Sequence, residues 1–186
     1  MNHRHRNKAL ALQLLCWQYY RLNHAWIIEE MKKHHISKMP KLLGYLGLLP
    51  FIVPTVFLFF DDMHLDMWRH FLLSYGAVIL SFVGALHWSF AMLLHELPIN
   101  KQRWSFFWSV IPSLVAWMSL SIPKFYGFIL LTAFFAIALI RDKQLSDKVE
   151  LPAWYTPLRR NLTIVAMTCL LIAAYLGNGR QLINLI

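Results

Sequence analysis

Hydrophobic and polar residues in this chain are grouped into long blocks that do not alternate at a short period. The longest block without Asp, Glu, Lys or Arg covers residues 71–94, enough at about 1.5 Å per residue to cross roughly 30 Å of hydrocarbon. Shorter apolar blocks cover 42–60, 104–122, 125–140 and 162–176. The pattern predicts an all-α, polytopic membrane protein with five transmembrane helices between residues 42 and 186.

The segment before the first apolar block, residues 1–41, is basic and mixed in polarity. Apolar residues recur at helical spacing over 9–31, but polar side chains interrupt them too often for a membrane span. This predicts an amphipathic helix lying on the membrane surface. In the alternative interpretation, translation starts at Met39, directly before the first span, and residues 1–38 are not part of the protein.

The helix predicted over 71–94 carries a row of small residues on one side. Spacings of three and four place them together on a helical wheel, and small residues let a second membrane helix approach closely. The sequence therefore predicts a helix-packing seam, facing either another helix of the chain or a partner. Its members are Ser74, Ala77, Ser81, Gly84, Ala85 and Trp88.

Composition and charge support the membrane assignment and set the orientation. The chain is 58% hydrophobic and has a net charge of +9. Given five spans, 15 of its 18 Lys and Arg residues fall on one side, which predicts that the N-terminus is cytoplasmic and the C-terminus outside. Because these cations are confined to certain loops, we expect anionic lipids on the cytoplasmic face as the counterpart, and no nucleic acid. The first residues are basic, but the first strongly apolar run begins near residue 42, too late and too long for a signal peptide, so we expect no cleavage.

His87 is the one ionisable side chain that the pattern places well inside a predicted span. Such a residue is a functional candidate by default, as a ligand to a bound group or a proton carrier; the alternative is a neutral histidine that only hydrogen-bonds to a neighbouring helix. Prolines interrupt the first and third spans, and helix breaks near the bilayer middle can line a cavity for a lipid or quinone. The candidate ligand-binding residues are His87, Trp88, Pro50, Pro112 and Ser113.

Two further groups lie at the predicted membrane surfaces. Trp154, Tyr155, Arg159 and Arg160 stand in the loop predicted over 141–161, directly before the last span, and are interpreted as an interfacial anchor. In the outer loop, Asp61, Asp62 and Asp66 with His64 form either a weak cation site or a solvated loop.

The sequence contains no recognisable catalytic or cofactor signature. Two cysteines, Cys16 and Cys169, lack metal-ligand spacing, and neither a phosphate-binding glycine loop nor a paired nucleophile and base stands out. We therefore expect no catalytic residues, no metal and no cofactor.

Three phrases resemble a known family. LGYLGLLPF (residues 43–51), SYGAVILSFVGALHW (74–88) and LPAWYTPLRRNLT (151–163) are similar to domain-of-unknown-function family 3429, the transmembrane protein 69-like membrane proteins. The resemblance covers roughly 41–175; the basic segment before Met39 and Ser89, where glycine is expected, depart from it. It implies a multi-pass protein of bacterial inner membranes, or of mitochondria in eukaryotes, with no established activity.

These inferences lead to two functional hypotheses for a bacterial inner-membrane protein. The first is a non-enzymatic scaffold or accessory subunit that packs through its seam against its own helices, a second copy or another membrane protein. The alternative is a binding protein or carrier for a hydrophobic small molecule near His87 and the proline breaks.

Overall fold

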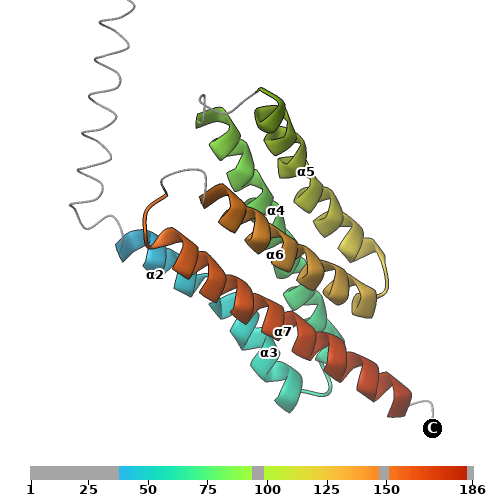
Figure 1. Cartoon of the computed structure of the whole chain (residues 1–186). Coiled ribbons are helices and arrows are strands. Elements are labelled where there is room, and N and C mark those ends of the chain that lie inside the picture. The colour runs from blue at the N-terminus through green and yellow to red at the C-terminus, as the bar shows by residue number, and fades with distance from the viewer. Residues whose placement is uncertain (1–37, 94–98, 147–150, 184–186) are drawn as a thin grey trace, which may run out of the picture. The chain divides into compact units, whose positions relative to one another are not determined.

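The computed structural model describes residues 38–93, 99–146 and 151–183. The described residues form α-helices joined by short connections (Figure 1): α2 (Lys38–Leu46), α3 (Leu49–Phe60), α4 (Leu65–Leu93), α5 (Ile99–Ser121), α6 (Lys124–Ser146) and α7 (Tyr155–Ile183). Contacts divide the chain into two units, Met1–Leu42 and Leu43–Ile186, and helices α3 to α7 all belong to the second unit. The amphipathic helix predicted over 9–31 lies outside the described residues.

The first apolar block is interrupted between α2 and α3. The interruption falls at Gly47 and Leu48, and Pro50 follows in the first turn of α3, where a proline removes no helical hydrogen bond. The Tyr75 hydroxyl of α4 donates a hydrogen bond to the Gly47 carbonyl oxygen, 2.8 Å away. A backbone acceptor exposed by the break is thereby satisfied, as the membrane interior requires.

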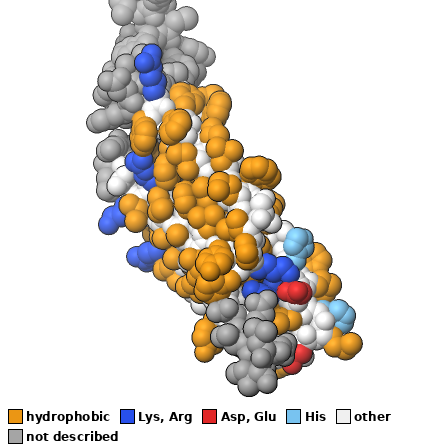
Figure 2. Space-filling view, turned by 90° about the vertical axis from the view of Figure 1, so that its right-hand side faces the viewer, with side chains coloured by type: hydrophobic (Ala, Val, Ile, Leu, Met, Phe, Trp, Pro, Cys, Tyr) orange, Lys and Arg blue, Asp and Glu red, His pale blue; other side chains and the backbone are white. Residues whose placement is uncertain are grey.

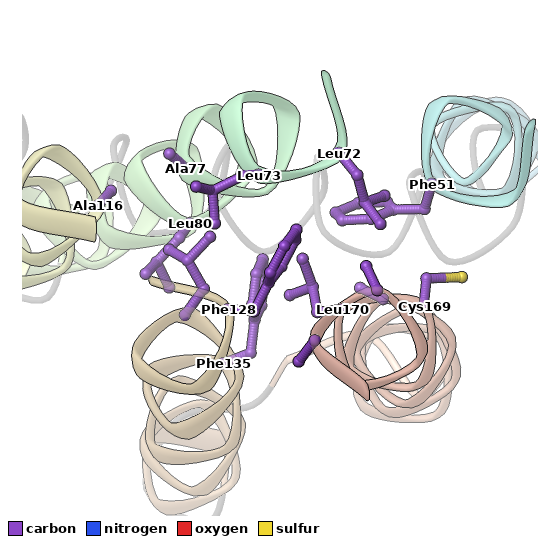
Figure 3. Packing of buried hydrophobic residues seen from close by; sticks show 14 of the residues in the cluster. Phe51, Leu72, Leu73, Ala77, Leu80, Ala116, Phe128, Phe135, Cys169 and Leu170 are labelled. Carbon is purple, nitrogen blue, oxygen red and sulfur yellow. The ribbon is translucent and has the colours of Figure 1, made fainter. Parts of the chain in front are cut away.

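Helix α4 is central to the bundle, because it contacts α3, α5, α6 and α7. Its buried side chains meet those of the neighbouring helices in one apolar core. In Figure 3, Phe128 and Phe135 of α6 point toward Leu80 of α4 and Leu170 of α7. The helix that contains the longest predicted apolar block thus contacts each of the helices α3, α5, α6 and α7.

The outside of the bundle is also apolar. Figure 2 shows hydrophobic side chains over most of the visible described surface, with charged groups toward its ends. Large residues such as Phe82, Trp117 and Tyr175 are 61%, 67% and 78% exposed. An apolar exterior of this extent suits a protein surrounded by lipid.

The predicted count of five spans is confirmed only in part. Among the described residues, four helices are long and apolar enough to cross a membrane: Lys38–Phe60, Leu65–Ser89, Lys124–Ser146 and Tyr155–Gly177. Helix α5 is not among them, although it packs against α4 and α6. Its buried serines, Ser109 and Ser119, contribute to this lower apolar content.

Two helices also extend beyond their predicted limits, into the loop expected over 141–161. Helix α6 continues to Ser146 and α7 begins at Tyr155. These extensions bring charged residues into the helical bundle.

Candidate functional site

His87 lies on the face of α4 that points into the bundle. It shares this face with Leu80 and Val83, at spacings of seven and four residues, and all three side chains are buried. The imidazole Nδ1 lies 3.3 Å from the Val83 carbonyl oxygen. The other ring nitrogen, Nε2, faces α6.

The residue that His87 faces is Asp142, near the end of α6. His87 Nε2 lies 3.5 Å from Asp142 Oδ1, and Asp142 is only 3% exposed. The sequence pattern predicted a loop at this position, so Asp142 was missed as a site residue. The spacing of the inward residues of α6 gives the signal that was available: Phe135, Ala138 and Asp142 follow one another at three and four residues and are all buried.

Arg159, in the first turns of α7, supplies the opposite charge. Its Nε donates a 2.7 Å hydrogen bond to Asp142 Oδ2. Its Nη2 lies 2.6 Å from the same oxygen but makes no hydrogen bond there, so Nε carries the directional contact. We call His87, Asp142 and Arg159 the His87 cluster; it joins α4, α6 and α7 at one end of the bundle.

The four predicted anchor residues therefore do different things. Arg159 is turned into the His87 cluster with 12% of its side chain exposed, whereas Arg160 is exposed. Trp154 and Tyr155 are half-buried, with ring centroids 6.3 Å apart in an edge-to-face arrangement. The sequence pattern did not distinguish the two arginines.

A second cation contact lies beside the cluster. The Arg141 guanidinium stands 4.7 Å from the ring centroid of Trp108 and 5.8 Å from that of Trp104, both on α5. Cation–π contacts of this kind stabilise a charge that has little water around it. The end of α6 is thus tied to α5 through Arg141 and to α7 through Asp142.

The predicted seam is used partly inside the chain. A Cβ atom built on Gly84 would stand 2.8 Å from the Ser109 carbonyl oxygen and 3.0 Å from Pro112 Cβ, so α5 packs directly on the Gly84 backbone. Trp88 makes an edge-to-face contact with Phe106 of α5 at 5.5 Å. Of the remaining seam residues, Ala77 is buried, Ser74 and Ser81 are half-buried and Ala85 is exposed.

The candidate ligand-binding residues point in different directions. Pro50 is exposed on α3, Pro112 fills the space over Gly84, and His87 faces α6. Ser113, next to Pro112, is half-buried. The described structure does not bring these prolines to the imidazole.

Charged residues at the opposite end of the bundle form separate contacts. Lys124 Nζ, at the start of α6, lies 2.9 Å from Asp66 Oδ1, at the start of α4. Arg69 is 3% exposed, next to the Gly177 backbone and 5.7 Å from the Phe128 ring centroid. The sequence pattern assigned Arg69 to the outer loop and gave no sign of its burial.

The outer loop itself is organised around Asp61. Its carboxylate accepts a 3.0 Å hydrogen bond from the Trp68 indole and lies 3.0 Å from His64 Nδ1. The Trp68 hydrogen bond has the largest effect and lowers the pKa of Asp61; desolvation raises it by less, and the contacts with His64 lower it further. No group of three or more His, Cys, Asp or Glu residues placed to hold a metal ion occurs within the described part of the chain.

Comparison with known proteins identifies the family. A family model described as "Protein of unknown function (DUF3429)" matches residues 36–175. The chain is similar to "Transmembrane protein 69" of Xenopus tropicalis, with 26% identity over an alignment of 154 residues; the match covers 76% of this chain and 60% of that protein. No solved structure matches the chain. The chain therefore belongs to the DUF3429 family of proteins of unknown function, as its three resembling phrases predicted.

Proposed function

We propose that this membrane protein is a non-enzymatic scaffold or accessory subunit that presents a preformed helical bundle to a partner in the membrane. The observation that supports this is that small and polar residues of its helices contact other helices of the same chain. Gly84 is covered by α5, and in the His87 cluster an Asp142–Arg159 ion pair joins α6 to α7 while His87 of α4 lies against Asp142. Such contacts favour a bundle with one fixed arrangement of helices.

We also propose that α5 crosses the membrane as the fifth span. The start of α6 pairs with the start of α4 through Lys124 and Asp66, and a later part of α6 approaches α4 through Asp142 and His87. Helices α4 and α6 therefore run parallel. Helix α5 connects the end of α4 to the start of α6, so it must cross the bundle in the opposite direction. Its 23 residues span about 35 Å, which is long enough to cross the membrane.

The same bundle suggests its orientation. With five spans, the loops beside the His87 cluster fall on the side that carries most Lys and Arg, so this end is cytoplasmic and the C-terminus is outside. Exposed cations there, such as Lys143 and Arg160, suit anionic lipid head groups. We propose a bacterial inner membrane as its location, one of the two that the family resemblance implies.

Native mass spectrometry of the protein, released gently from its own membrane, tests the scaffold role. We expect a second polypeptide or a second copy to stay bound in the wild-type protein and in His87→Gln. Gly84→Val, which displaces α5, should release it, and Ala85→Val, on the exposed neighbour, should not. A protein that carries no polypeptide partner in any of these forms would contradict the proposal.

A second candidate function is binding of a hydrophobic small molecule that carries a polar group. It is favoured by two buried atoms, His87 Nε2 and Asp142 Oδ1, which make no hydrogen bond within the described residues. In the same spectra, a small-molecule adduct that is lost in His87→Ala and kept in His64→Ala would support this role. A spectrum without any adduct would count against it.

A further inference from the structure

Each ring nitrogen of His87 faces a hydrogen-bond acceptor. Nδ1 lies 3.3 Å from the Val83 carbonyl oxygen, and Nε2 lies 3.5 Å from Asp142 Oδ1. A neutral imidazole has one N–H, so it can donate to only one of these oxygens and must turn a lone pair toward the other. An imidazolium donates to both.

Asp142 has one oxygen to offer to His87. Arg159 occupies Oδ2, whereas Oδ1 makes no hydrogen bond within the described part of the chain. An ionised carboxylate only accepts hydrogen bonds, and a buried acceptor without a donor is costly. An N–H on Nε2 would therefore give Asp142 Oδ1 a donor, while an N–H on Nδ1 would point at the Val83 carbonyl oxygen.

We propose that His87 and Asp142 form a proton-binding site, in which the bound proton makes His87 an imidazolium that donates to Val83 and to Asp142. The proton comes from water on the side of the membrane where the cluster lies, and no other bond is made or broken. With the proton in place, α4 is held to α6 by an ion pair that Arg159 extends to α7. This inference is independent of the scaffold role.

Charges on all the helices around His87 decide whether the proton stays. On α6, Asp142 attracts it and Arg141 repels it; on α7, Arg159 repels it and the Tyr155 phenol is neutral. Within the described part of α5, no charged side chain attracts or repels a proton on His87. Two α5 tryptophans make cation–π contacts with the Arg141 guanidinium. Among the described residues, Asp142 is therefore the one negative group that attracts the proton, while burial and two arginines oppose it.

Nitrogen NMR of the full chain in lipid nanodiscs, with ¹⁵N-labelled histidine, reads the state of the ring directly. We expect the His87 signals to show hydrogen on both ring nitrogens at the acidic end of a titration over about pH 5 to 8, the range in which histidines change charge. In Asp142→Asn, the same signals should show hydrogen on one nitrogen across the whole range. The signals that disappear in His87→Gln are assigned to His87. If that variant does not fold, a chain in which His87 is the one remaining histidine gives the same assignment.

Two results would overturn the proposal. One is a wild-type His87 with a single protonated nitrogen throughout the titration. The other is an imidazolium that persists unchanged in Asp142→Asn, because the proton would then be held by something other than this pair. His64→Gln, which alters a histidine of the exposed outer loop, is the matched control and should leave the His87 signals in place.

Discussion

Replacing Gly84 with valine tests how tightly α5 is packed on α4. The first atom of the new side chain, Cβ, would stand 2.8 Å from the Ser109 carbonyl oxygen and 3.0 Å from Pro112 Cβ. Neither obstacle is the free end of a flexible side chain: one is backbone and the other is part of a ring. The valine therefore has to move α5 away from α4.

Overpacking a tight contact of this kind costs about 1–3 kcal/mol. At about 1.4 kcal/mol for each factor of ten, the equilibrium between folded and unfolded protein should shift roughly 5- to 150-fold toward unfolding. Titration with a denaturing detergent in mixed micelles, followed by tryptophan fluorescence, measures this shift. The separation should also weaken the ring contact between Trp88 and Phe106, which lies one turn further along α4.

Ala85→Val is the matched control, because residue 85 is the sequence neighbour of Gly84 but is exposed. The same final side chain at this exposed position should leave the midpoint nearly unchanged. Equal midpoints for Gly84→Val and Ala85→Val would mean that α5 does not rest on the Gly84 backbone.

Three further predictions concern charged residues. Asp142→Asn should destabilise the protein in the same titration by about 3–5 kcal/mol, because it leaves a buried arginine without its counter-charge; a change near zero would contradict the buried pair. Gly177→Ala places a methyl group against the Arg69 guanidinium. In a double-mutant cycle with Arg69→Met, the effects of the two substitutions on stability should therefore be coupled by about 0.5–3 kcal/mol. Strictly additive effects would contradict the contact. Because the folded-state pKa of Asp61 lies below its ordinary 3.8, its contact with Trp68 is complete above that pH and is lost as pH falls below it; the fluorescence change over that range should disappear in Asp61→Asn.

Much of the membrane architecture follows from the apolar blocks, because a span of about twenty apolar residues has few alternatives to a helix in lipid. The block at 71–94 predicted the long helix α4, and the small-residue row on it contains Gly84, where α5 packs most closely. The block at 104–122 likewise predicted a helix where α5 lies. Its serines and tryptophans lower the apolar content, so α5 is not among the candidate spans, and its contacts with α4 and α6 indicate that it belongs in the bundle.

The candidate site was predictable only in part. His87 stands out because it interrupts an apolar block, but its partners do not, because Asp142 and Arg159 lie in a stretch that is mixed in charge and was interpreted as a loop. From the sequence alone, each charged residue is interpreted as the limit of an apolar block and therefore of the predicted span. Here they remain inside the helical bundle because they neutralise one another across α6 and α7, and such a pairing is a property of the fold.

Cysteine labelling shows on which side of the membrane each end of α5 lies. In a chain whose two native cysteines are replaced, single cysteines at Met63, Ser121 and Lys143, all exposed, are introduced one at a time and treated in intact cells with a reagent that cannot cross the membrane. We expect positions 63 and 121 to react from outside, and position 143 to react only after the membrane is opened. Protection of position 121 together with reaction at position 63 would mean that α5 does not cross, and would contradict the arrangement with five spans.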